Sequence, residues 1–195
     1  MKIVIRQPRK NEAREAARLV LLAWPIEQFI DESKGETYEK LEAMISRTIE
    51  MENTLYSYKN ILVAEAIDDE NSTKNQLVGA LCGYDGDMYH QLKTPVLEVL
   101  QLDQNSVWGR TDETKGGEYY LDSIGVDAHY RGLGIATKLF QQMFEKIKSL
   151  GFHRTGLIVD VDKPKAEALY ARIGFKFDEY RTFMGEPFKH MTKEL

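Results

Sequence analysis

A glycine-rich turn, RGLGIAT at residues 131–137, is the segment of this sequence best suited to bind a charged ligand. It follows an apolar run and precedes a helical pattern, so the first N–H groups of that helix lack partners. Glycines let an anion approach those groups, and the helix dipole adds about 0.3–1 kcal/mol per charge. Arg131 adds a full positive charge. The turn is therefore a candidate site for a phosphate-bearing ligand.

Three phosphate-binding patterns can be compared with this turn. The Walker pattern GxxxxGK[ST] is excluded, because no Gly-Lys pair follows at the required spacing. The dinucleotide pattern GxGxxG matches Gly132 and Gly134 but has Thr137 at the third glycine. It would indicate a nucleotide-dependent oxidoreductase, yet only one strand–helix–strand unit fits here, whereas that fold uses several. The third pattern, [RQ]xxGxG/A after a strand, is met by Arg131, Gly134 and Ala136.

Two carboxylates are candidates for proton transfer. Glu118 and Asp122 lie just before and within the predicted strand 119–126. Strand alternation places both on one face together with Ile124 and Val126. Either carboxylate could accept a proton, directly or through water, although a salt-bridged or solvated carboxylate is the simpler interpretation of each.

The elements around the turn predict a βαβ unit. YYLDSIGV (119–126) and TGLIVDV (155–161) are typical of strands, and a helical pattern lies between them. The two strands are expected to be parallel and the crossover right-handed. The apolar stripe of the helix comprises Ile135, Leu139, Met143, Ile147 and Leu150.

The remaining chain supplies further strands and helices. Residues 61–67 and 76–84 predict an antiparallel hairpin whose polar connection, DDENSTKN, forms an exposed tip. A helix begins at Pro164 and ends before Gly174, and FKFDEYRTFM and KHMTKEL supply closing strands. Residues 85–118 have mixed periodicity, for which we expect partial helix with an active-site edge.

Composition limits the classes of function. The chain has 26 Lys and Arg against 31 Asp and Glu, a net charge of −5 that disfavours nucleic-acid binding. A single cysteine, Cys82, cannot form an intrachain disulfide, and no metal-ligand spacing is present. No leader or membrane-spanning stretch is recognised. We expect one domain over residues 1–195, a cytoplasmic location, and no membrane partner or metal.

Two ordered motifs resemble the GCN5-related N-acetyltransferase (GNAT) superfamily. YYLDSIGVDAHYRGLGIATKLF resembles the coenzyme-A-binding motif, with Val126 five residues before Arg131. KPKAEALYARIGF resembles the second signature, and together the motifs cover residues 119–177. The resemblance implies an α/β (α+β) fold: a mixed, mostly antiparallel twisted sheet flanked by helices, with a βαβ coenzyme-A-binding unit.

The resemblance also implies acetyl-coenzyme A as co-substrate. Its pantetheine arm would pair with the backbone of Ile124 and Val126 like an added strand, and either N–H could bond the thioester oxygen. Gly125 between them either permits a bulge or relieves packing. Lys163 replaces an asparagine that contacts the cofactor in many members, and its ammonium could reach a phosphate instead. The diphosphate would lie on Arg131, Gly132, Leu133, Gly134, Ile135, Ala136 and Thr137.

Direct transfer to an amine needs a base and an acid, because a free alkylamine has a pKa near ~10.4 and a thiolate leaves more easily when protonated. Tyr170 resembles the family's thiol-protonating tyrosine, although its place on an apolar helix face is also typical of a core residue. Asp122 and Glu118 are the candidate bases.

The resulting hypothesis is an N-acetyltransferase that acts on a primary amine of a small molecule, peptide or protein in a ternary complex. A non-catalytic acyl-coenzyme-A-binding module is the alternative. The sequence does not identify the acceptor, the acyl chain length or the oligomeric state. Because most soluble oligomers are symmetric homodimers, we expect a homodimer.

Overall fold

The computed structural model describes residues 1–67 and 75–195, so seven residues of the predicted hairpin tip, 68–74, lie outside the described residues. The hairpin strands themselves are confirmed. The strands are β1 (Lys2–Arg6), β2 (Ile61–Ile67), β3 (Gln76–Asp85), β4 (Tyr119–Val126), β5 (Arg154–Asp160), β6 (Lys176–Phe183) and β7 (Glu186–Glu194). The α-helices are α1 (Ala13–Val20), α2 (Tyr38–Glu50), α3 (Tyr89–Leu100), α4 (Val107–Arg110), α5 (Ile135–Ser149) and α6 (Pro164–Ile173).

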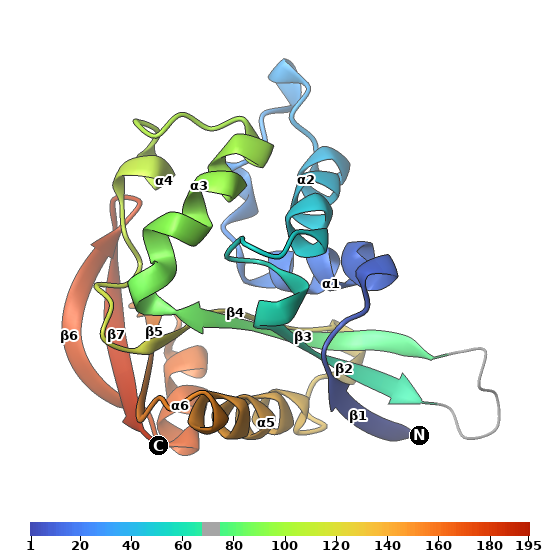
Figure 1. Cartoon of the computed structure of the whole chain (residues 1–195), viewed down its shortest axis with the longest axis vertical. Coiled ribbons are helices and arrows are strands. Elements are labelled where there is room, and N and C mark those ends of the chain that lie inside the picture. The colour runs from blue at the N-terminus through green and yellow to red at the C-terminus, as the bar shows by residue number, and fades with distance from the viewer. Residues whose placement is uncertain (68–74) are drawn as a thin grey trace.

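The strands form one seven-stranded sheet in the order β1-β2-β3-β4-β5-β7-β6. Neighbouring strands are antiparallel except β4 and β5, which are parallel and joined through α5. The predicted mixed, mostly antiparallel sheet with one βαβ unit is therefore confirmed. β6 lies at one edge of the sheet and rises with β7 toward α4 (Figure 1).

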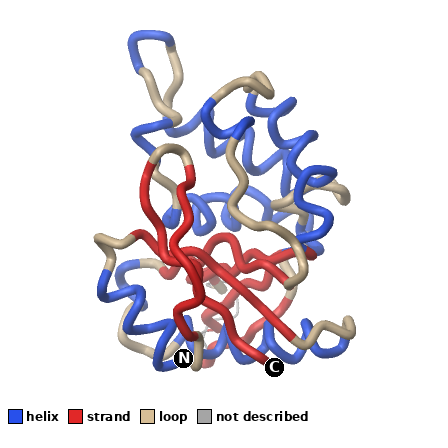
Figure 2. The backbone as a smooth tube through the Cα atoms, turned by 90° about the vertical axis from the view of Figure 1, so that its left-hand side faces the viewer, coloured by secondary structure: helices blue, strands red, loops and turns tan. Residues whose placement is uncertain are grey.

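Helices cover both faces of the sheet and enclose two hydrophobic clusters. The first cluster joins α1, α2 and α3 to one face, and the second joins α5 to the other (Figures 1 and 2). On α5, Ile135, Leu139, Met143 and Ile147 are buried as the apolar stripe predicts, whereas Leu150 is 54% exposed beyond the last turn. The 3.6-residue period thus locates the buried face correctly but not its end.

Residues 86–118 are partly helical, as expected. A short 3-10 turn leads into α3, which contains Pro95, and α4 adds one further turn. No helix in the described ranges is both long and apolar enough to span a bilayer.

Candidate functional site

The sheet opens between β4 and β5. The two parallel strands pair only at Tyr119 with Thr155 and Tyr120 with Gly156. Thr155 Oγ1 also donates a hydrogen bond of 2.7 Å to the carbonyl of Tyr119. Beyond this point β5 pairs only with β7, and β4 pairs only with β3. Among the residues that the structure describes, the stretch of β4 from Leu121 to Val126 therefore presents an edge without a strand neighbour inside the sheet.

The direction of the β4 backbone groups follows from its pairing with β3. Asp127 N–H donates to the carbonyl of Val78 at 2.9 Å, in the same register that aligns Val126 with Gly79. Alternate residues of an antiparallel strand point their N–H and C=O groups to opposite sides. Because Asp127 faces β3, the groups of Ile124 and Val126 face the opening.

A β-bulge lies at Asp122. On β4, Leu121 pairs with Gly83 and Ser123 pairs with Cys82, which leaves Asp122 as the extra residue. Asp122 contacts tyrosines of the α1–α3 cluster, whereas Ile124 and Val126 pack against the α5 cluster. The expectation that Asp122 shares a face with Ile124 and Val126 is wrong, because the bulge reverses the alternation between them.

Gly125 is explained by close packing rather than by a bulge. A Cβ built at this position would overlap the carbonyl oxygen of Leu19, at the end of α1, and approach Leu22. The absence of a side chain lets α1 lie directly on β4 beside the opening.

Asp122 is surrounded by hydroxyl groups. Tyr84 donates to its Oδ2 at 2.8 Å, and Tyr56 approaches the same oxygen at 3.3 Å. The Ser123 hydroxyl donates to Oδ1. Burial raises the pKa of Asp122 above its usual range, although all three hydroxyl bonds favour the charged form. A carboxylate with a raised pKa beside the opening is suited to accept a proton.

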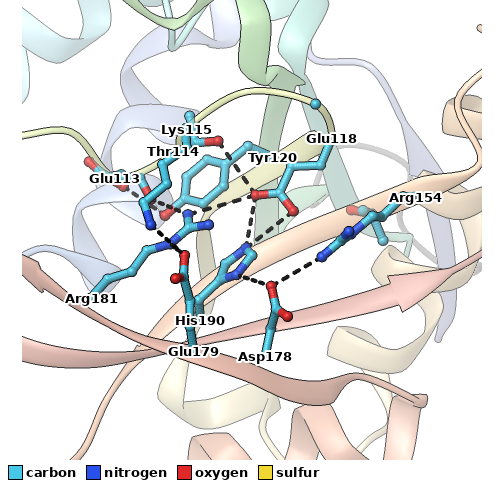
Figure 3. A network of polar contacts seen from close by, with 12 residues as sticks. Glu113, Thr114, Lys115, Glu118, Tyr120, Arg154, Asp178, Glu179, Arg181 and His190 are labelled. Carbon is cyan, nitrogen blue, oxygen red and sulfur yellow. Dashed lines mark hydrogen bonds and ion pairs between the residues drawn. The ribbon is translucent and has the colours of Figure 1, made fainter.

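Glu118 lies elsewhere, in a buried network at the paired end of β4 and β5 (Figure 3). Its carboxylate is 2.9 Å from His190 Nε2, and Thr114 Oγ1 donates to it at 3.4 Å. Arg181 Nη1 lies 3.9 Å away. His190 Nδ1 is 3.0 Å from Asp178, so the imidazole joins two carboxylates. These partners occupy Glu118 and favour the salt-bridged interpretation over a catalytic one.

Sequence reasoning missed Tyr56, Tyr84 and Glu113. Tyr84 lies opposite Tyr120 in the β3–β4 register, so strand alternation could have indicated it. Tyr56 follows α2 in a loop without a periodic signal. Glu113 is 8% exposed, accepts a hydrogen bond from Tyr120 at 3.1 Å, and has a pKa raised by burial.

Tyr170 lies on α6 and packs against the α5 cluster, on the face of the sheet opposite to Asp122. Its ring centroid is 5.9 Å from that of Phe140 and 6.2 Å from that of Phe175. Burial raises the pKa of Tyr170 to about 12. Its hydroxyl has no hydrogen-bond partner among residues 1–67 and 75–195, and it keeps contact with solvent. The phenol therefore carries its proton at neutral pH and can offer it as a hydrogen-bond donor.

The turn at 131–137 has the open geometry that the sequence predicts. Gly132 and Gly134 have φ angles of 79° and 73°, and a Cβ at either would meet nothing within 4 Å. In the described chain, no backbone hydrogen bond outside α5 uses the N–H groups of residues 132–137. Arg131 Nε donates to the carbonyl of Val126 at 3.1 Å, which places this guanidinium beside the open edge of β4.

Lys163 is the residue that precedes α6, close after the end of β5. Its side chain is exposed and forms no ion pair within the described residues. It is therefore free to meet an anion.

Comparison with known proteins gives consistent results. The sequence matches the acetyltransferase (GNAT) family over residues 23–175. The probable spermine N(1)-acetyltransferase of Bacillus subtilis subsp. natto (strain BEST195) is 33% identical over 85 residues, 43% of this chain and 55% of that protein, so the match spans about half of that relative. A crystal structure of an acetyltransferase is similar with a TM-score of 0.77 at 30% identity, covering 98% of both chains. An N-acetyltransferase from Staphylococcus aureus Mu50 has a TM-score of 0.80 at 25% identity, covering 97% of this chain and 100% of the other.

The network around Glu118 predicts a large effect on stability. The Glu118 side chain is 3% exposed and faces His190 and Arg181. Glu118→Gln removes its negative charge, so the free energy of unfolding should fall by about 3–5 kcal/mol in denaturant titrations. Glu52→Gln is the matched control, because its partner Lys59 is about half-exposed at 51% and the pair should contribute little. Equal losses in the two variants would contradict a buried network.

Proposed function

Because the chain belongs to the acetyltransferase (GNAT) family, we propose that it transfers an acetyl group from acetyl-coenzyme A to a primary amine by direct attack in a ternary complex. The observation that carries this proposal is the opening between β4 and β5. Its free β4 edge ends close to a turn of unpaired amides at residues 132–137. One continuous backbone surface can thus bind an extended, amide-containing chain that ends in a diphosphate.

In this proposal the backbone holds the co-substrate. The amides of residues 132–137 bind the diphosphate, and Arg131 contributes charge beside them. The N–H and C=O groups of Ile124 and the N–H group of Val126, which face the opening, pair with the amides of the pantetheine arm, and one N–H points to the thioester oxygen. Lys163 is assigned to a phosphate, because its ammonium is exposed and unpaired in the described chain.

The proton transfers are assigned to opposite sides of the opening. Asp122 lies on the α1–α3 side and takes the proton of the attacking amine. Tyr170 lies on the α5 side and gives a proton to the leaving thiol. Direct transfer needs both groups at the reacting carbon: a base beside the attacking amine and an acid beside the leaving thiolate. Glu118 is assigned a structural role, since His190 and Arg181 occupy its carboxylate.

The relative from Bacillus subtilis is named for spermine, which supports an amine acceptor for this chain. We further propose that the protein is cytoplasmic and forms a homodimer. For the dimer, β6 is an edge strand that exposes Phe177 by 50% and Tyr180 by 68%. Binding of acetyl-coenzyme A without turnover of any amine would favour the alternative, a non-catalytic binding module.

Cofactor binding tests the turn. Arg131→Gln removes a charge beside the diphosphate site, so the Kd for acetyl-coenzyme A should rise about tenfold in isothermal titration calorimetry. Lys148→Gln, at the opposite end of α5, should leave the Kd unchanged. A wild-type protein that does not bind acetyl-coenzyme A would refute the proposed function.

The proton donor is tested by Tyr170→Phe. We expect kcat to fall about 10²-fold, because only the hydroxyl that protonates the thiol is lost, while the Kd for acetyl-coenzyme A stays unchanged. The control is Tyr180→Phe on β6, where the side chain is 68% exposed. An unaltered kcat in Tyr170→Phe would make Tyr170 a core residue only.

The base is tested by pH dependence. Asp122 must be ionised to accept a proton, and its pKa is raised by burial. Activity should therefore decline on acidification through a pKa above the usual Asp value of about 3.9. Asp122→Asn should lower kcat about 10²-fold or more and abolish this acidic limb. An acidic limb that persists in Asp122→Asn would assign it to another group.

A further inference from the structure

Two carboxylates contact tyrosines of the α1–α3 cluster, and each has a tyrosine of its own. Tyr84 on β3 donates a hydrogen bond of 2.8 Å to Oδ2 of Asp122. Tyr120 on β4 donates one of 3.1 Å to Oε2 of Glu113 (Figure 3). The two tyrosines lie opposite each other in the β3–β4 register, with ring centroids 5.8 Å apart. Neighbouring rings thus direct their hydroxyls to different carboxylates.

The two carboxylates differ in their access to the opening between β4 and β5. Asp122 is the extra residue of the bulge and is partly exposed, whereas Glu113 is 8% exposed. Burial and the negative charge of Asp122 both raise the pKa of Glu113 well above its usual range. Glu113 therefore keeps its proton at a pH at which Asp122 has lost its own.

No cation in the described part of the chain is among the groups that shift the pKa of Asp122. Its polar contacts there are the hydroxyls of Tyr84, Tyr56 and Ser123. The other ionisable side chains that interact electrostatically with Asp122 are acids or neutral groups, namely Glu113, Cys82, Tyr89 and Tyr120. A negative charge in such surroundings is stabilised by the hydroxyl donors that face it.

The tyrosine hydroxyls depend on this carboxylate in turn. Tyr84 and Tyr56 are 0% and 1% exposed, and their bonds to Asp122 are the hydrogen bonds that these hydroxyls donate within residues 1–67 and 75–195. A carboxylate is a stronger acceptor than a neutral carboxyl group, so protonation of Asp122 would weaken both bonds. The bond from Tyr84 is the shorter, 2.8 Å against 3.3 Å, and should stabilise the charged form more.

We infer that Tyr84 is a positioning residue of the proposed reaction, whose hydroxyl holds Asp122 as a carboxylate beside the opening, ready to accept the proton of the amine. This inference rests on the proposed function for the role of Asp122. The proton leaves the amine nitrogen and joins a carboxylate oxygen of Asp122. Tyr84 keeps its own proton, because burial raises its pKa well above the usual range.

Titration of the Asp122 carboxyl by ¹³C NMR tests this inference without any ligand, and Asp122→Asn identifies its signal. Tyr84→Phe removes a donor to the charged form, so the titration midpoint should rise by about one pH unit. Tyr56→Phe removes the longer bond and should raise the midpoint by less. It also tests the inference if Tyr84→Phe does not fold.

The matched control is Tyr120→Phe. Tyr120 and Tyr84 are both 0% exposed, and each substitution removes one hydroxyl bonded to a buried carboxylate. Because the hydroxyl of Tyr120 faces Glu113, Tyr120→Phe should leave the midpoint of Asp122 unchanged.

Catalysis is then compared across pH. We measure kcat at saturating acetyl-coenzyme A with an amine that the wild-type protein acetylates, beginning with spermine. In Tyr84→Phe the acidic limb should move up by the same pH unit, so kcat on that limb falls about tenfold and recovers at higher pH. Recovery at higher pH distinguishes a role in the charge of Asp122 from a merely structural one.

The outcomes separate this inference from the proposed function. An Asp122 midpoint that stays in place without the tyrosine hydroxyls, or that moves equally in Tyr120→Phe, would overturn the inference. A kcat of Tyr84→Phe that is low at every pH would also overturn it, because Tyr84 would then be structural. If the midpoint moves as expected but the wild-type protein acetylates no amine, the proposed function fails, and Tyr84 still holds the charge of Asp122.

Discussion

The loss of pairing between β4 and β5 after Tyr120 is the constraint on which the rest of the site depends. Two parallel strands that diverge leave one row of backbone donors and acceptors unpaired, and a folded protein satisfies such groups with solvent or a ligand. In this chain the free row belongs to β4, whose other edge pairs with β3 on both sides of the bulge at Asp122. The strand is thus held rigidly on one side and available on the other.

The position of the divergence is fixed from both ends. At the paired end, Glu118 occupies the space where Gly156 lacks a side chain and joins His190 on β7, so three strands are tied together. At the open end, Gly125 lets α1 pack directly on β4. Between them the bulge turns Asp122 toward the α1–α3 side while Ile124 and Val126 face the α5 side. One irregular residue thereby distributes acidic and apolar groups to opposite sides of the opening.

The parts predictable from the sequence are those set by local periodicity. The α5 stripe, the glycine turn and the βαβ order depend on residues close in the chain, and the structure confirms them. The bulge at Asp122 depends on how β4 aligns with β3, which alternation within one strand cannot reveal. The partner of Glu118 is His190, 72 residues later, and no local pattern links them. Pro95 obscured α3, because a proline inside a helix is normally unfavourable.

Amide hydrogen exchange, resolved by residue with NMR, tests the central claim most directly. On saturation with coenzyme A, exchange should slow at Ile124, at Val126 and across residues 132–137. Gly125 and Asp127 should change little, because their N–H groups already face β3. Equal slowing of exchange at Ile124, Gly125, Val126 and Asp127, or no slowing at Ile124 and Val126, would contradict the binding of the co-substrate along the free edge of β4.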